Sequence, residues 1–215
     1  MFITFEGLDG SGKTTQIKEA TAKLRDAGAK ILLTREPGGT YIGDQTREIL
    51  FDKKEDATQH PMNPRTELLL FCASRAQLVA EVIRPHLASG GIVISDRFFD
   101  STYAYQGYGH GLDLKALRAI VDFATAGLKP DLTIYFDITP EEALRRRQRA
   151  SLFGEEFNRL DAMEVEFRQR VYKGYQKLMK KDPARWVTID ASQSIGDVQS
   201  DLMKLLNKHL KLRAR

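Results

Sequence analysis

Short apolar runs alternate with amphipathic segments along the whole chain. Five runs have the length and composition of buried strands, at 2–5, 31–33, 92–94, 132–136 and 186–189. The segments between them carry apolar residues at helical spacing, at about 14–27, 40–51, 64–89, 113–126, 140–150, 160–181 and 194–211. Strands that are separated by helices pair in parallel and are covered on both faces. The pattern therefore predicts an α/β fold with a five-stranded parallel sheet between two layers of helices.

The same pattern indicates a single domain. The length of 215 residues fits one hydrophobic core, and the chain has no repeat, no low-complexity tract and no linker. Gly28, Gly90 and Gly127 follow predicted helices, at the left-handed position that favours glycine. We therefore expect residues 1–215 to fold as one unit.

The composition says more about the cellular compartment and the possible partners of the protein than about its chemistry. Cys72 is the only cysteine, which excludes an internal disulfide framework and favours a reducing compartment. Lysine and arginine number 33 against 29 acidic residues, and this net charge of +4 is too small to argue for a polynucleotide partner. No stretch approaches the ~18 apolar residues of a membrane span, and no charged and apolar leader precedes the first strand. We expect a cytoplasmic protein without a membrane partner.

A glycine-rich segment that ends in lysine and threonine follows the first predicted strand. Its spacing is that of a P-loop, in which backbone N–H groups of the loop and of a helix N-terminus hold nucleotide phosphates. Lys13 is expected to reach the β- and γ-phosphates, and Thr14 to bind Mg²⁺. A glycine-rich turn without a ligand is the alternative, although the full pattern arises by chance in only roughly one chain in a hundred. The predicted ATP-binding residues are Gly7, Leu8, Asp9, Gly10, Ser11, Gly12, Lys13, Thr14 and Thr15.

The third predicted strand ends in Asp96 and Arg97. A carboxylate at the carboxyl end of a buried strand beside a P-loop is typical of the acid that holds Mg²⁺, directly or through water. Arg97 would then lie beside the phosphates, where a planar guanidinium matches phosphate oxygens. A helix N-cap or a structural Asp–Arg pair is the alternative. We predict that Thr14 and Asp96 form the metal site.

The segment after the second strand is suited to a substrate loop. Residues 34–40 contain Arg35, Glu36 and a Pro-Gly-Gly turn, and they leave the carboxyl end of a strand beside the predicted phosphate site. A plain turn is the alternative. Arg47, one helix later, faces either the same place or solvent.

Two further segments carry groups that match a nucleobase and a sugar. Phe71 and Arg75 are four residues apart, so they share a helical face that could hold a flat base by stacking and hydrogen bonding. Phe71 in the core and Arg75 at its rim is the alternative. The segment 101–107 gathers hydroxyls, aromatic rings and an amide. Its candidate contacts are Ser101, Thr102, Tyr105 and Gln106.

Several arginines lie close together in the helix that is predicted to begin at residue 140. Arg145 and Arg149 share a helical face, Arg147 lies between them, and the glycine-containing segment that follows is expected to move as a lid over about 145–160. Arginines this close repel one another unless anions or carboxylates lie nearby. A solvated face balanced by glutamates of the same helix is the alternative.

These groups suit phosphoryl transfer between two nucleotides. Such transfer needs in-line positioning and charge neutralisation more than covalent help. A phosphate acceptor has its second pKa at about 6, so it is largely ionised at neutral pH and needs no catalytic base. The remaining obstacle is repulsion between two anions, which Lys13, Arg97, the arginines near 147 and Mg²⁺ would offset. A GTPase is disfavoured because no Asn-Lys-x-Asp segment is present.

At this point the chain resembles the thymidylate kinases among the P-loop nucleoside monophosphate kinases. The resemblance covers residues 2–190 and is carried by five motifs in this order. They are the P-loop segment 6–16, the Thr-Arg-Glu-Pro-Gly-Gly-Thr segment 34–40, Leu-Phe-Cys-Ala-Ser-Arg at 70–75, Asp-Arg-Phe at 96–98, and Ser101-Thr102 with Tyr105-Gln106-Gly107. It implies a three-layer P-loop NTPase fold with a small lid, and transfer of phosphate from ATP to dTMP with Mg²⁺ in the synthesis of dTTP.

The resemblance also implies residue roles. Phe71 would stack on thymine, Arg75 would hydrogen-bond its edge, and Thr102 and Gln106 would close around it. The other residues implied to contact dTMP, through its sugar, its phosphate or the nearby metal, are Asp9, Glu36, Arg47, Arg97 and Tyr105. Because position 10 is glycine, the chain is similar to the members whose catalytic arginine comes from the lid, for which the candidates are Arg149 and then Arg147. Such proteins are usually homodimers.

Two other hypotheses remain open from the residues. One is a P-loop kinase for a different small acceptor, such as a deoxynucleoside or another monophosphate. The other is a nucleotide-binding regulator that keeps the P-loop without transferring phosphate. The acceptor-side group formed by Arg97 and Gln106 disfavours the regulator, because a binding module does not need it.

Overall fold

The computed structural model describes residues 1–52, 61–152 and 165–210. Its core is one sheet of five parallel strands in the order β2-β3-β1-β4-β5. The strands are β1 (Phe2–Gly7), β2 (Ile31–Arg35), β3 (Ile92–Asp96), β4 (Leu132–Asp137) and β5 (Trp186–Asp190). The α/β prediction and all five predicted strands are therefore confirmed.

Helices connect the strands in the described part of the chain. The α-helices are α1 (Lys13–Asp26), α2 (Tyr41–Phe51), α4 (Pro64–Leu78), α5 (Arg84–Ala88), α6 (Phe99–Thr102), α7 (Leu114–Thr125), α8 (Pro140–Leu152), α9 (Val165–Lys181) and α10 (Ile195–Leu210). Two π-helical segments, η1 (Val79–Ile83) and η2 (Tyr103–Gly109), interrupt or extend them. The apolar pattern did not predict α6 and η2. Of the predicted helices, positions 160–164 and 211 lie outside the described residues.

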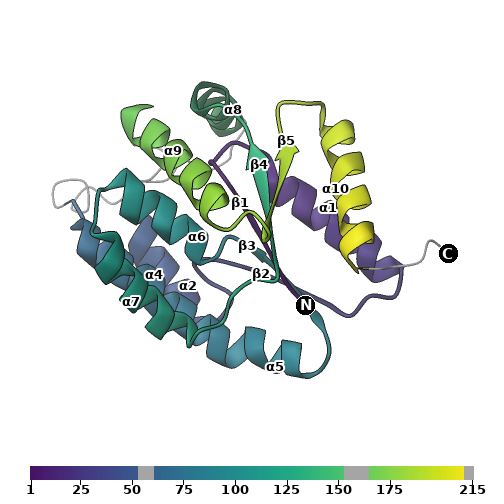
Figure 1. The fold of residues 1–215 in the computed structure, drawn as a ribbon, viewed down its shortest axis with the longest axis horizontal. Helices are drawn as coiled ribbons and strands as arrows, with labels where there is room; N and C mark the ends of the chain where they lie inside the picture. The colour runs from purple at the N-terminus through teal and green to yellow at the C-terminus, as the bar shows by residue number, and fades with distance from the viewer. Residues whose placement is uncertain (53–60, 153–164, 211–215) are drawn as a thin grey trace.

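The sheet lies between two layers of helices (Figure 1). Helices α1 and α10 contact each other on one face, and α4, α6, α7 and α9 cover the other. Because both faces are covered, consecutive residues of β1 are buried, including Phe2, Ile3 and Phe5. Within the described residues, no helix combines the length and the apolar composition that crossing a bilayer would require.

The strand order places a crevice beyond the carboxyl end of β1. The chain leaves β1 through α1 to β2, returns to pair β3 with β1, and later adds β4 on the other side of β1. The direction in which the chain adds strands thus reverses at β1. At such a point the loops after neighbouring strands lead away in opposite directions, which opens a ligand site between them. The P-loop follows β1, and Asp96 ends β3, so both predicted phosphate-site elements reach this crevice.

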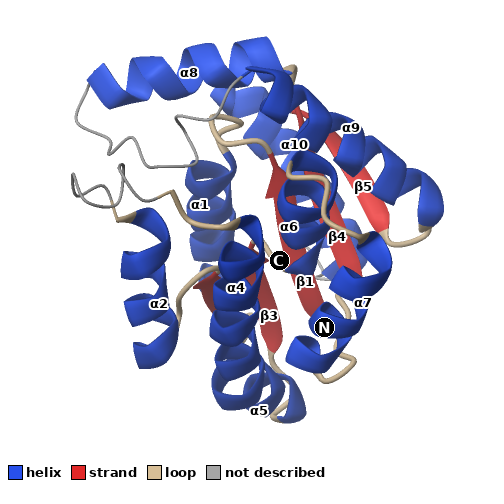
Figure 2. Cartoon of the chain, turned by 90° about the vertical axis from the view of Figure 1, so that its left-hand side faces the viewer, coloured by secondary structure: helices blue, strands red, loops and turns tan. Residues whose placement is uncertain are grey.

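Helix α8 lies across this end of the molecule (Figure 2). Gly10 of the P-loop has φ +93°, and a Cβ at this position would collide with the backbone carbonyl oxygen of Ala143 on α8. Glycine is therefore required here both by backbone conformation and by the close approach of α8. Residues 153–160 of the predicted lid lie outside the described residues, so the lid stays a prediction.

Helix α9 packs closely against η2. A Cβ added at Gly174 of α9 would lie 2.8 Å from the Cβ of Tyr108, and one added at Gly109 of η2 would lie 2.8 Å from the ring of Phe167. Real Cβ atoms do not approach other heavy atoms so closely, so the two glycines allow this contact. The packing fixes the position of η2 over the crevice.

Candidate active site

A cleft at the carboxyl ends of β1, β2 and β3 gathers most of the predicted site residues. Its volume is about 900 Å³, including space that is open to solvent. This volume is within the usual range for pockets that bind small molecules. All ten residues predicted to contact the acceptor nucleotide line it: Asp9, Glu36, Arg47, Phe71, Arg75, Arg97, Ser101, Thr102, Tyr105 and Gln106. Lys13, Thr14 and Asp96 form its wall on the P-loop side.

The P-loop connects β1 to α1 and closes over Lys13. Gly7, Gly10 and Gly12 all have positive φ, which explains glycine at these positions. The ammonium of Lys13 is held 3.1 Å from the carbonyl oxygens of Gly7 and Leu8. Burial, reinforced by the charge of Arg97, lowers the pKa of Lys13 to about 8. The loop thus presents a desolvated cation at the mouth of the cleft, at the start of α1, where Thr14 and Thr15 are exposed.

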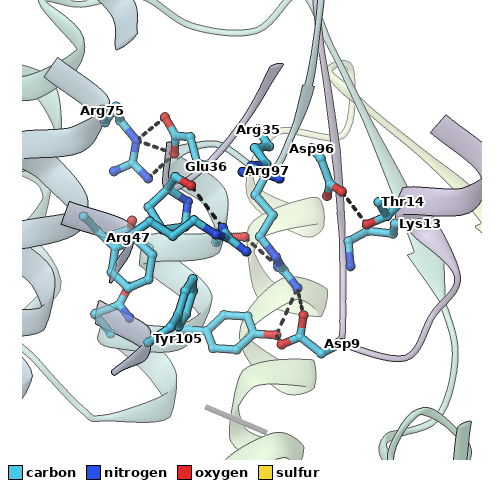
Figure 3. A pocket seen from close by; sticks show the side chains of 16 residues that line it. Asp9, Lys13, Thr14, Arg35, Glu36, Arg47, Arg75, Asp96, Arg97 and Tyr105 are labelled. Carbon is cyan, nitrogen blue, oxygen red and sulfur yellow. Dashed lines mark hydrogen bonds and ion pairs between the residues drawn. The ribbon is translucent and has the colours of Figure 1, made fainter. Parts of the chain in front are cut away.

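Thr14 and Asp96 meet across the loop. The hydroxyl of Thr14 donates a hydrogen bond of 2.6 Å to Oδ2 of Asp96 (Figure 3). Oxygen atoms of this kind are the ligands that Mg²⁺ prefers, and Mg²⁺ typically takes one or two protein ligands together with substrate phosphates. Among the described residues, no group of three or more His, Cys, Asp or Glu side chains could hold a metal by itself. The pair therefore fits an ion that is shared with a nucleotide.

Arg97 lies at the centre of the cleft, in front of the P-loop. Its Nη2 donates to Oδ1 of Asp9 at 2.7 Å, and its Nη1 donates to Ser101 at 2.8 Å and to Tyr175 at 3.2 Å. Its φ is +73°, a conformation that is unusual outside glycine and is found where the surrounding structure enforces it. Burial opposes ionisation of Asp9, but the charges of Arg97 and Lys13 outweigh it and hold the pKa of this carboxyl well below its usual range.

The part of the cleft beside α4 is built on a buried ion pair. Nε and Nη2 of Arg75 donate to Oε2 of Glu36 at 2.9 and 2.6 Å, and the two side chains are 1% and 3% exposed. Arg75 is therefore inside the cleft rather than at the rim of the core, while Phe71, one turn earlier, is half-buried. The sequence did not predict the pairing of Glu36 with Arg75.

Other predicted residues reach the cleft from α2 and from the α6–η2 segment. Arg47 donates to the carbonyl oxygen of Pro37 at 3.0 Å and lies 4.7 Å from the ring centre of Phe51. The hydroxyl of Tyr105 donates to Oδ2 of Asp9 at 3.1 Å. Figure 3 shows the side chains of Arg97 and Tyr105 both pointing towards Asp9.

The two candidate arginines of the predicted lid lie on α8, outside the lining of the cleft. Arg149 is exposed and Arg147 is partly buried. Neighbouring arginines of this helix are held by Glu142, which accepts hydrogen bonds of 2.7 Å from Nε of both Arg145 and Arg146. Neither Arg147 nor Arg149 therefore lines the cleft in this structure, and their catalytic role stays a prediction.

Sequence reasoning assigned no role to Glu6, which supports Arg97. Glu6 is fully buried and accepts hydrogen bonds from the backbone N–H of Phe98 at 2.9 Å, from Ser101 at 2.6 Å and from Tyr175 at 2.8 Å. Its Oε2 lies 3.8 Å from Nη1 of Arg97. The one feature of the sequence that could have drawn attention to Glu6 is that an acidic residue stands in the apolar strand β1. No feature of the sequence indicated that Tyr175, which comes from α9, would join this group.

Glu6 predicts a pH dependence of stability. Burial raises the pKa of Glu6 from 4.5 to about 7, although the charge of Arg97 opposes the shift. Because the pKa is higher in the folded than in the unfolded chain, the stabilisation is fully present below pH 4.5 and is lost as the pH rises through about 7. The loss is at most about 3 kcal/mol.

Glu6→Gln should therefore flatten the fall in the free energy of unfolding between pH 4.5 and 7. Urea unfolding of the wild type and the variant across this range measures the difference. Glu48→Gln, which changes an exposed acid of α2, serves as the control and should follow the wild type. A Glu6→Gln curve as steep as the wild-type curve would contradict the prediction.

The fold and the cleft together define the class of the protein. A P-loop, a carboxylate at the end of the neighbouring strand, and an arginine-lined cleft in front of the loop define a P-loop kinase of a small anionic acceptor. The thymidylate kinase family model matches residues 5–202. The chain belongs to the thymidylate kinase family.

Curated relatives agree with this assignment. A thymidylate kinase of Roseiflexus castenholzii is 50% identical over 98% of this chain and 94% of the relative. Those of Caldanaerobacter subterraneus and Chlorobium luteolum are 46% and 45% identical over 98% of this chain, and the matches cover 96% and 99% of those proteins. The similarity therefore includes every described element of the cleft.

Proposed function

We propose that this chain transfers the γ-phosphoryl group of ATP directly to dTMP, giving ADP and dTDP in the synthesis of dTTP. The observation that carries the proposal is the position of Arg97 between the P-loop and the part of the cleft that Phe71 and Arg75 line, which we call the recess. Such a cleft holds a donor phosphate and an acceptor phosphate end to end. The names of the curated relatives support the choice of dTMP.

The cleft contributes positive charge, which offsets the repulsion between the two phosphate groups. The acceptor phosphate is largely ionised at neutral pH, so the attacking oxygen needs no catalytic base, and the barrier is repulsion between two anions. Lys13 and Arg97 face the transferred group, and Arg47 stands at the acceptor side. These cations are already desolvated and held in place, so they stabilise the charge of the transition state without reorganising.

The base recess supplies orientation. We assign stacking to Phe71 and hydrogen bonding to Arg75, whose guanidinium is fixed by Glu36. We assign Thr102 and Gln106 to the edge of the base, Tyr105 to the sugar carbon that would carry a ribonucleotide's 2′-hydroxyl, and Asp9 to the sugar hydroxyl. The contacts of Tyr105 and Asp9 with each other support this placement.

Mg²⁺ fits the Thr14–Asp96 pair, which would hold it next to the donor phosphates. When bound, the ion neutralises charge on those phosphates and draws them into one geometry. We further propose that an arginine of α8, Arg149 or else Arg147, approaches the transferred group when both nucleotides are bound. The contact of α8 with the P-loop at Gly10 supports this assignment.

A panel of acceptors tests the proposed function. We expect ADP formation from ATP and Mg²⁺ to be fast with dTMP and slow with dCMP, GMP and thymidine. A coupled assay of ADP release measures the rates, and dUMP tests the contribution of the thymine methyl group. Faster turnover of another acceptor than of dTMP would refute the substrate, and ATP turnover that no acceptor alters would favour the nucleotide-binding regulator.

We also propose a homodimer and a cytoplasmic location. Large apolar side chains are exposed on adjacent helices: Tyr41 and Ile49 on α2, Leu69 on α4 and Phe123 on α7. An apolar surface of this kind is typical of an interface between subunits. Light scattering should give twice the chain mass of 24.3 kDa. The single, buried and reduced Cys72 supports a reducing compartment.

A further inference from the structure

Glu67 is a fully buried acid next to the cleft, and the mechanism above does not use it. It lies on α4 and is 0% exposed. Its Oε1 accepts a hydrogen bond of 2.7 Å from Nε2 of Gln106, and Nε2 of His110 lies 3.3 Å from the same oxygen. Gln106 lines the cleft, whereas Glu67 does not. Glu67 can therefore affect a substrate only through its neighbours.

Helix α4 places this acid on the same face as the base-binding groups. Glu67, Phe71 and Arg75 follow one another at intervals of four residues, and side chains at this spacing share a helical face. The ring and the guanidinium line the recess, and the carboxylate extends from the next turn towards η2, where it meets Gln106. One face of α4 thus lines the recess directly with Phe71 and Arg75 and also holds Gln106, which lines the cleft from η2.

The contact determines which end of the Gln106 amide faces the recess. A side-chain amide has a donating NH₂ end and an accepting oxygen end, and its orientation follows the hydrogen-bond partners around it. A carboxylate accepts hydrogen bonds and donates none. The NH₂ end of Gln106 is therefore held towards Glu67, outside the lining of the cleft, and the carbonyl oxygen is the end that remains for the recess.

Arg75 gives the recess the complementary group. A guanidinium only donates hydrogen bonds, and Glu36 fixes its plane through Nε and Nη2. The recess therefore offers a donor from Arg75 and an acceptor from Gln106. Thymine and uracil present a carbonyl oxygen beside an N–H group and match this pair, whereas cytosine presents an amino group beside an unprotonated ring nitrogen and mismatches both.

We propose that Glu67 is a positioning residue for base selection, which orients the Gln106 amide so that its oxygen accepts a hydrogen bond from the ring N–H of the acceptor base. The inference rests on the proposed function, because it assumes a pyrimidine monophosphate in the recess. Sites built to hydrogen-bond a substrate group reject analogues that lack it, since buried polar groups are then left unpaired.

Replacement of Glu67 by methionine tests the proposal. Glu67→Met removes the acceptor at similar side-chain length, so the NH₂ group of Gln106 is free to turn into the recess and oppose the ring N–H of dTMP. We expect the ratio of kcat/KM for dTMP to that for dCMP to fall at least about tenfold, mainly through a higher KM for dTMP, while the KM for ATP stays within about twofold. Calorimetric titration of the full chain with dTMP and with dCMP should give the same change in the ratio of Kd values.

Two further variants separate positioning from folding. Glu67→Gln retains an oxygen that can accept from Gln106, so its dTMP-to-dCMP ratio should lie between those of the wild type and Glu67→Met, and it tests the same orientation if the methionine variant does not fold. Glu81→Met is the matched control, because Glu81 accepts a 2.7 Å hydrogen bond from Gln77 on the exposed part of the same helical stretch. Its ratio should equal that of the wild type.

The outcomes distinguish this inference from the proposed function. Wild-type protein that does not phosphorylate dTMP would refute the proposed function. Wild-type protein that uses dTMP, together with folded Glu67 variants whose dTMP-to-dCMP ratio of Kd is unchanged, would refute the role of Glu67 alone. A ratio that falls in Glu67→Met and recovers partly in Glu67→Gln would support it.

Discussion

Replacement of Lys13 by alanine is expected to lower kcat for dTMP phosphorylation by about 10²–10³-fold, which is the usual effect of removing one preorganised charge from a transition state. Lys13 is 5% exposed and is the only cation in the P-loop sequence 7–15, so no other cation of the loop can replace it. The KM for dTMP should change much less, because the lysine faces the donor phosphates. Steady-state kinetics with saturating ATP measures both parameters.

Stability separates this catalytic role from a structural one. The lost hydrogen bonds from the charged ammonium to Gly7 and Leu8 are worth about 1.5–3 kcal/mol each, and removal of a desolvated charge offsets part of this loss, so the Lys13→Ala variant should fold. Lys23→Ala is a matched control on the same helix, where the lysine is exposed and pairs with Glu19, and it should retain wild-type kcat. If the two variants had equal kcat, or if Lys13→Ala lost its folded structure at the assay temperature, the assigned role would be wrong.

The exchange of Arg97 for lysine is expected to lower kcat/KM for dTMP by about 100-fold although the positive charge is kept. The two Nη groups of Arg97 bond Asp9, Ser101 and Tyr175 at the same time, and the guanidinium can also hold two oxygens of a phosphate. A lysine ammonium is a single point charge and cannot do both. The KM for ATP should stay close to the wild-type value.

Arg25→Lys is the control for this exchange, because Arg25 also uses two nitrogens, here to bond the carbonyl oxygen of Ile31, at a position outside the cleft lining. Its kinetics should match the wild type. Comparable losses in both variants would indicate a general effect of the substitution, and a loss of less than about threefold in Arg97→Lys would show that the fork geometry is not needed. Circular dichroism of both variants checks that the fold is retained.

The features predicted from sequence are those that depend on local spacing. The apolar runs gave the strands, because a covered parallel sheet buries consecutive residues. The intervals between glycines, Lys13 and Thr14 gave the P-loop, and the interval of four gave the shared face of Phe71 and Arg75. Asp96 and Arg97 could be placed at the cleft because the carboxyl ends of parallel strands meet at one edge of the sheet.

The features that were missed depend on contacts between distant segments. Glu36 and Arg75 are 39 residues apart, and no local pattern indicates that they form a buried pair. Tyr175 joins Glu6 across 169 residues, so only the packing of α9 reveals it. The π-helical segment η2 carries site residues such as Tyr105 where a regular amphipathic helix would carry core residues, which hid it from the apolar pattern.

The close packing of α9 on η2 has a consequence for biosynthesis. Gly174 allows α9 to reach η2, and from the following position Tyr175 bonds both Arg97 and Ser101. Every described residue that lines the cleft precedes residue 107, but the side chain that holds Arg97 and Ser101 from behind comes from a helix that is translated late. A nascent or prematurely terminated chain that ends before Val165 therefore has all of these lining residues but lacks the hydroxyl of Tyr175, which holds Arg97 in place.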